Sequence, residues 1–202
     1  RESLRIREKA NGRVHGSVAR GLFDLGSILE PSGKIAEAES CLREGLSIRE
    51  TLYARRDPDV DASTLALTWA GLGGFLSRKG ELAESERALR RSLALRDSTN
   101  DHGYAWARAA MQLGSVLTAQ NRAAEAEPLQ RRALAALESF IDAGDARIGE
   151  ARIALAETLL RQNKREESAA MFQRVIDEFP PQGERHVLDG ARSGLAKVRL
   201  TK

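Results

Sequence analysis

Apolar side chains recur along this chain at intervals of three and four residues, with polar side chains between them. The first set is Leu22, Leu25 and Leu29, and the later sets are Trp69, Leu72 and Leu76, then Leu113 and Leu117, then Leu155 and Leu159. This spacing places the apolar groups along one side of a helix. It predicts four amphipathic helices, each with one buried stripe.

A second amphipathic stretch follows each of these helices after a short polar break. Each break contains residues that favour turns, and the four breaks are Pro31-Ser32-Gly33, Lys79-Gly80, Gln120-Asn121 and Gln162-Asn163. The pattern therefore predicts four helix–turn–helix units.

These units are copies of one another. The string "LGSILEPSGKIAEAE" at 25–39 returns as "LGGFLSRKGELAESE" at 72–86, "LGSVLTAQNRAAEAE" at 113–127 and, more weakly, "LAETLLRQNKREESA" at 155–169. Each copy has a small residue near its start, which lets two helices approach closely: Gly26, Gly73, Gly114 and Ala156. Successive small residues are 47, 41 and 42 positions apart. Such periods are typical of repeat proteins built from helix pairs. We expect an all-α fold, an α-solenoid of stacked antiparallel helix pairs.

The repeat resembles a known family. The pattern Trp69-x2-Leu72-Gly73, and the small residue followed four positions later by a large one (Ser85 and Leu89, Ser168 and Phe172), resemble the tetratricopeptide repeat. Pro180 falls where that repeat tends to end. The period of about 42 residues, with "EAEPLQRRAL" at 125–134 and "LRIRE" at 4–8, is similar to the kinesin-light-chain type, which is also common in bacterial multidomain proteins.

The repeat divides the chain within one predicted domain, 1–202. The divisions are 1–15, the end of a truncated preceding repeat; 16–62, 63–103, 104–146 and 147–182, repeats one to four; and 183–202, a C-terminal capping helix. The truncated start predicts that the chain is a segment of a larger protein. The long first interval places extra residues near 54–63, which predicts a longer loop or an extra helical turn.

Composition and charge narrow the class of protein. No apolar run approaches the roughly 20 residues that span a bilayer, and we expect no membrane partner. The single Cys41 cannot form an internal disulfide, which favours a cytoplasmic protein. Basic and acidic residues balance in both halves, 17 and 16 in 1–102 and 15 and 13 in 103–202. The net charge of +3 therefore gives little support to nucleic-acid binding.

Catalytic and metal-binding patterns are not found in the sequence. His15 and His102 occupy equivalent positions between repeats, which indicates a shared packing or capping role, and His186 lies near the start of the last helix. There is no HExxH, cysteine pair or GxSxG pattern. We expect no enzyme activity, metal or cofactor.

A series of arginines on the second helices offers an alternative function. Arg43, Arg90, Arg91, Arg131, Arg132 and Arg174 could form a groove for nucleic acid. However, Glu39, Glu86 and Glu127 each lie four residues before an arginine of this series, the favourable helix-surface pairing. These carboxylates favour a solvated outer face over a nucleic-acid site.

The tetratricopeptide resemblance implies that the first helices line a concave groove. The predicted groove residues are Arg20, Phe23, Ser27 and Glu30; Leu67, Ala70, Gly74 and Ser77; Arg108, Met111, Ser115 and Thr118; and Glu150, Ile153, Glu157 and Arg161. Mixed apolar and charged groups suit a peptide or a partner helix. We expect a protein-interaction scaffold whose partner is a protein or peptide. The alternative is an intramolecular regulatory or spacer arm, with the groove occupied by another domain of the same protein.

Overall fold

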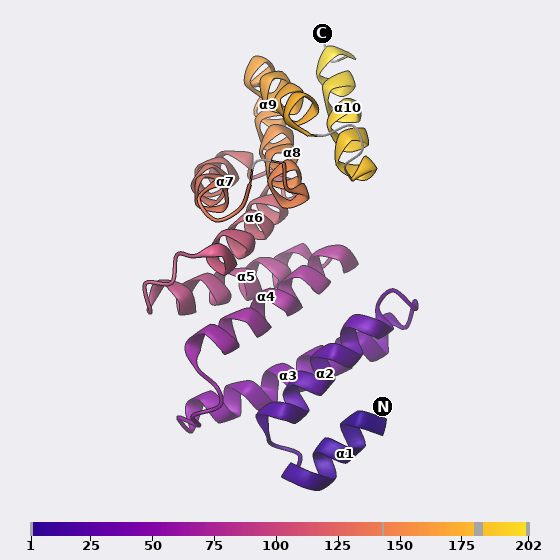
Figure 1. Ribbon diagram of the computed structural model, residues 1–202, viewed down its shortest axis with the longest axis vertical. Helices are drawn as coiled ribbons and strands as arrows, with labels where there is room; N and C mark the ends of the chain where they lie inside the picture. Colours follow the sequence, from indigo (N-terminus) through magenta and orange to yellow (C-terminus); the bar gives the residue numbers. More distant parts are fainter. Residues whose placement is uncertain (1, 143, 180–183, 201–202) are drawn as a thin grey trace. The chain divides into compact units, whose positions relative to one another are not determined.

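The computed structural model describes residues 2–142, 144–179 and 184–200, and within these ranges it contains ten α-helices and no strand (Figure 1). This confirms the all-α prediction. The helices are α1 (Glu2–Asn11), α2 (Gly16–Leu29), α3 (Ile35–Ala54), α4 (Ala62–Lys79), α5 (Leu82–Asp97), α6 (Tyr104–Ala119), α7 (Ala123–Glu138), α8 (Ala146–Arg161), α9 (Arg165–Glu178) and α10 (Arg185–Leu200). Pro180, the expected end of the fourth repeat, lies outside the described residues.

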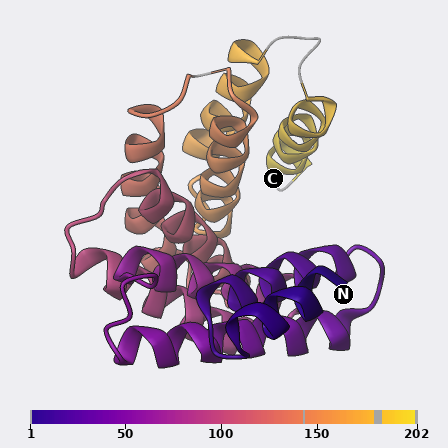
Figure 2. The ribbon, with the colours of Figure 1, turned by 60° about the horizontal axis from the view of Figure 1, so that its bottom comes forward.

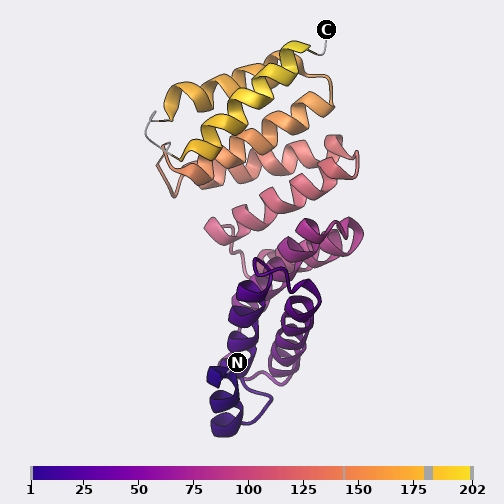
Figure 3. The same ribbon diagram turned by 90° about the vertical axis from the view of Figure 1, so that its right-hand side faces the viewer.

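The helices form two compact units, 1–101 and 102–202. In the first unit α2 pairs with α3 and α4 with α5, while α1 lies against α2 (Figure 2). In the second unit α6 pairs with α7 and α8 with α9, while α10 packs against α8 and α9 (Figure 3). The first helices of these four pairs begin at Gly16, Ala62, Tyr104 and Ala146, each within one residue of the start of a predicted repeat; the division of the chain into these repeats stays a prediction. The grouping of both units into a single domain stays a prediction.

The turn inside each pair has the same backbone geometry. A residue with positive φ follows the first helix in every pair, and these are Gly33, Gly80, Asn121 and Asn163. The next amide then donates to a carbonyl five residues back, as from Glu81 N to Leu76 O at 2.9 Å. This is the Schellman arrangement, which satisfies carbonyls at a helix end. Glycine and asparagine tolerate the required conformation best, so the breaks in the sequence pattern mark these turns.

Close helix approach holds each pair together. At Gly73, a Cβ atom would lie only 2.7 Å from Cγ of Leu89 on the facing helix. Both residues are buried, and the hydroxyl of Ser85 donates to the carbonyl oxygen of Gly73 at 2.7 Å. Ser168 makes the same bond to Ala156 at 2.8 Å. The small residues of the repeat therefore permit both tight packing and a buried hydrogen bond.

The extra residues of the first repeat lengthen a helix. α3 has 20 residues, whereas α5 and α7 have 16 each. The additional turn precedes a loop that ends at Asp61, whose carboxylate accepts from the amide of Thr64 at 2.7 Å. Among the described residues, no helix is long and apolar enough to cross a membrane.

Candidate functional site

The predicted groove residues of the first unit lie on α2 and α4. Arg20, Ser27 and Leu67 are exposed, with Leu67 53% accessible. The other members are half-buried or buried: Phe23, Glu30, Ala70 and Ser77 are half-buried, and Gly74 is buried.

Two of these half-buried residues are already engaged in the fold. The ring of Phe23 lies against glycines of two other helices, since a Cβ on Gly45 would stand 2.8 Å from it and one on Gly71 3.2 Å. Both carboxylate oxygens of Glu30 accept from Arg78, at 2.6 and 2.8 Å. These hydrogen bonds hold the pKa of Glu30 below its usual value. Phe23 and Glu30 therefore stabilise the contacts between α2, α3 and α4.

The predicted groove residues of the second unit lie on α6 and α8. Arg108, Ser115, Glu150, Glu157 and Arg161 are exposed, and Ile153 is half-buried.

Two of the expected groove side chains, Met111 and Thr118, are buried. The hydroxyl of Thr118 lies 2.7 Å from that of Thr158 and 2.9 Å from the carbonyl oxygen of Gly114, where α6 and α8 pack together. Met111 belongs to a helix in which ten of sixteen residues are buried. The buried side of α6 is therefore broader than one apolar stripe, and the assignment of these two residues to a partner-binding groove stays a prediction.

The helix α10 contacts part of the predicted face of α8. A Cβ on Gly190 would lie 3.4 Å from Cδ1 of Ile153, and His186 Nε2 lies 3.1 Å from a carboxylate oxygen of Glu150. Glu157 and Arg161, one to two turns further along α8, are exposed.

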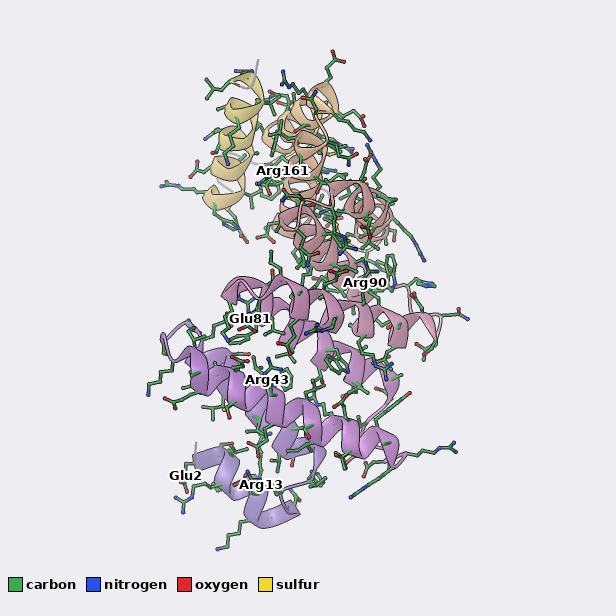
Figure 4. All side chains as sticks on the ribbon, turned by 180° about the vertical axis from the view of Figure 1, so that it is seen from behind. Glu2, Arg13, Arg43, Glu81, Arg90 and Arg161 are labelled. Carbon is green, nitrogen blue, oxygen red and sulfur yellow. The ribbon has the colours of Figure 1, made fainter. Side chains whose placement is uncertain are left out.

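A cavity of about 450 Å³ lies beside that part of α8. Four predicted groove residues line it, and the full lining comes from α6 (Ser115, Thr118 and Ala119), α8 (Ala154, Glu157, Leu160 and Arg161), α9 (Phe172) and α10 (Gly194 and Lys197). The aliphatic and aromatic groups offer a site for an apolar side chain, and the charges of Glu157 and Arg161 stand beside it. Arg161 is labelled in Figure 4.

Four of the six arginines in the series on the second helices are held in ion pairs, namely Arg43, Arg90, Arg131 and Arg174. Arg43, labelled in Figure 4, contacts Glu39 on its own helix and Glu84 on α5. The distances are 2.8 Å to Glu39 and 2.7 Å to Glu84. Arg131 likewise contacts Glu127 at 2.9 Å and Glu167 on α9 at 2.6 Å. The predicted pairs with Glu39, Glu86 and Glu127 are therefore confirmed. Because these guanidinium groups are already paired with carboxylates of the fold, the geometry disfavours phosphate binding along this series of arginines.

Sequence reasoning missed three buried arginines. Arg152 stands at the repeat position of Trp69, and its guanidinium donates to Glu138 at 2.8 Å and also pairs with Glu178. Arg49 and Arg96 occupy equivalent positions on α3 and α5, and both are buried. The signal was an arginine at repeat positions where other copies carry apolar residues.

The histidines do not assemble a metal site. His15 caps α2, because its Nδ1 accepts from the amide of Ser17 at 3.1 Å. His102 packs edge-on against Trp106, with ring centroids 5.5 Å apart. In the part of the chain that the structure describes, no group of three or more His, Cys, Asp or Glu side chains could hold a metal ion.

Solved structures with this arrangement of helices include proteins of the kinesin-light-chain type. BtubC (BKLC) from P. vanneervenii is 17% identical, with a TM-score of 0.80 over 98% of this chain and 78% of that protein. A Podosopora anserina protein described as a kinesin light chain with nearly identical TPR-like repeats is 16% identical, with a TM-score of 0.75 over 92% and 87%. YrrB, described as a TPR protein with an unusual peptide-binding site, is 16% identical, with a TM-score of 0.59 over 98% and 85%. No curated protein matches the chain in sequence.

Family models agree with the structural comparison. Models described as "Tetratricopeptide repeat" match residues 19–52, 64–139 and 107–177, which together include α5 to α8 and most of α2, α3, α4 and α9. The chain belongs to the tetratricopeptide repeat family.

Proposed function

We propose that this chain is a non-catalytic interaction scaffold that binds an extended peptide or a partner helix along α6 and α8. The observation that carries the proposal is the cavity of about 450 Å³, in which four predicted groove residues converge on an apolar lining. An apolar side chain of the partner would enter the cavity. Charged neighbours of that side chain would face Glu157 and Arg161.

The chemistry of this face suits such a partner. Peptide-recognition grooves combine apolar pockets with a few polar groups that fix orientation. Proteins of the tetratricopeptide repeat family are generally protein-interaction scaffolds, and YrrB is described as having a peptide-binding site. The packing of α10 against α8 also supports a helix as one form of partner.

An intramolecular arm would use the same surface. In that case the peptide would belong to another segment of the same protein, and the cavity chemistry would be unchanged. Nucleic acid is disfavoured, because two of the arginines that would contact phosphates are already paired, Arg43 with Glu39 and Glu84, and Arg131 with Glu127 and Glu167.

A cavity-filling variant tests this proposal. Peptides would be selected from a phage-displayed library of random linear sequences against the parent chain. Ala154→Trp should then weaken their binding by roughly tenfold or more, because the indole would occupy the cavity. The matched control is Ala135→Trp, at an exposed position on α7. Affinity would be measured by calorimetry after circular dichroism has shown equal helicity.

Either of two results would contradict the proposal. One is a parent chain that selects no peptide family. The other is a set of peptides that bind the parent and Ala154→Trp equally well, which would place the interaction elsewhere.

A further inference from the structure

A second cavity, of about 420 Å³, lies in the first unit among α1, α2, α3 and the loop before α4. It differs from the cavity of the second unit because its lining is rich in cationic groups. Three arginines from three different helices line it: Arg7, Arg20 and Arg49. The one carboxylate among the lining residues belongs to Asp59.

Arg49 is a buried cation that forms no ion pair with a carboxylate of the described residues. The residue is only 8% exposed. Its guanidinium group donates to the hydroxyl of Thr68 and lies 5.3 Å from the centre of the Phe23 ring. Among the described residues no carboxylate lies within ion-pair distance of it, whereas the equivalent Arg96 pairs with Asp101. A buried charge is normally compensated, because desolvation is costly.

The electrostatic surroundings of Arg49 agree with this geometry. Burial and the nearby charge of Arg20 hold the pKa of Arg49 below its ordinary value, and Asp24 opposes them only in part. An anion bound in the cavity would stabilise the charged form of Arg49 and so offset both the burial and the repulsion from Arg20.

The N-terminus of α2 also faces this cavity through Gly16 and Ser17. His15 satisfies the amide of Ser17 with its ring and the amide of Val18 with its carbonyl oxygen, at 3.1 and 3.0 Å. Within the described part of the chain, the amide of Gly16 donates to no group. Helix N-termini carry a partial positive charge and favour anions.

We propose that this cavity binds a phosphoryl group as its dianion. The lining carries three guanidinium charges and one carboxylate, so a dianion balances it, whereas a single carboxylate would leave a net positive charge. Planar guanidinium groups and free helix amides are typical phosphate donors. The site goes beyond the peptide-binding proposal and does not depend on it, because it lies in the other unit.

Titration with inorganic phosphate tests the site directly. Amide chemical shifts of Gly16 and Ser17 would be followed by NMR in the full 202-residue chain at constant ionic strength, with acetate as the carboxylate comparison. Phosphate should give saturable shifts, and Arg20→Gln should weaken its binding by about tenfold. Arg165→Gln, which removes an exposed arginine of α9 in the second unit, should leave binding unchanged. Shifts that never saturate, an equal effect of both variants, or acetate binding as tightly as phosphate would overturn the proposal.

A thermal measurement checks the role of Arg49 separately. Phosphate should raise the Tm of the parent chain and leave that of Arg49→Met unchanged, since methionine keeps the bulk but removes the charge. An equal rise in both would overturn the assignment.

Two sources of the phosphoryl group can then be separated with a phosphoserine peptide. Tighter binding of this peptide than of inorganic phosphate supports a phosphorylated protein partner, and equal binding supports a small phosphorylated ligand. An unphosphorylated peptide that binds as well as the phosphopeptide would overturn the site.

Discussion

At the scale of the residue, Gln130 departs from the repeat. In the other three helix pairs the corresponding positions hold Leu42, Leu89 and Phe172. Leu42 and Leu89 pack against the glycine of the facing helix, and Phe172 belongs to the same buried cluster as Ala156. Gln130 fills the same position against Gly114, and both its amide nitrogen and its amide oxygen are buried with no hydrogen-bond partner among the residues that the structure describes. A polar group in that position lowers stability, because it loses its hydration without compensation.

Gln130→Leu should therefore raise the free energy of unfolding by about 1–2 kcal/mol. Urea denaturation followed by circular dichroism measures this change. Gln162→Leu is the matched control and should lower stability, because Gln162 donates to Ala123 O at 3.1 Å and to Glu127 at 2.8 Å. A loss of stability in Gln130→Leu would show that the buried amide has a favourable role.

At the scale of the element, α7 carries a proline beyond its first turn. Pro128 is the sixth residue of Ala123–Glu138. Its missing N–H leaves the carbonyl of Ala124 without its usual helical donor. Ala124 and Pro128 are both exposed, so water can reach this part of the helix. The helix continues through the proline for ten further residues.

Pro128→Ala should raise the free energy of unfolding by about 2 kcal/mol. A proline inside a helix costs about 3 kcal/mol, which the substitution would recover. Alanine also makes the unfolded chain more flexible, and this entropy favours unfolding by roughly 1 kcal/mol. Thermal denaturation compares this variant with Pro58→Ala, which changes an exposed turn residue and should lower stability slightly. Equal behaviour of the two variants would contradict the helical explanation.

At the scale of the whole molecule, both units contain carboxylates whose pKa is lowered by cationic partners. Lys164, Arg131 and Gln162 donate to Glu127 and hold its pKa at about 2. Hydrogen bonds from Arg147 do the same for Asp145, whose pKa is also about 2. Similar bonds lower the pKa values of further carboxylates: Glu30, Glu39, Glu84 and Glu178.

Acid should therefore destabilise the chain. A carboxylate with a lowered folded-state pKa stabilises the fold above its unfolded pKa, and this contribution is lost as pH falls through the folded pKa. For Glu127 that window runs from its ordinary value of 4.5 down to about 2. We expect Tm to fall across this window in circular dichroism melts, and to fall less in Glu127→Gln. A Tm that is constant or rises between pH 4.5 and 2 would contradict the role of these pairs.

The helices and their turns could be predicted because each residue pattern has a local cause. The spacing of leucines indicates the buried side of each helix. The turns are indicated by residues that tolerate a positive φ: Gly33, Gly80, Asn121 and Asn163. The candidate site was less predictable, because its exposure depends on which other helices cover a given face. Periodicity could not show that Thr118 meets Thr158 or that Ile153 lies beside α10. It also could not show which buried arginine would lack a carboxylate, because Arg49 and Arg96 occupy the same repeat position.

The ion pairs between neighbouring second helices have a consequence for tandem duplication of a repeat. Three successive repeats carry a glutamate and, six residues later, an arginine: Glu37 and Arg43, Glu84 and Arg90, Glu125 and Arg131. Within each unit the arginine of one repeat reaches the glutamate of the next, as Arg43 does with Glu84 and Arg131 with Glu167. A tandem duplication of one repeat would thus supply a matching donor and acceptor at its new junction. In the fourth repeat the arginine position holds Gln173, so a copy inserted after α9 would lack this bridge.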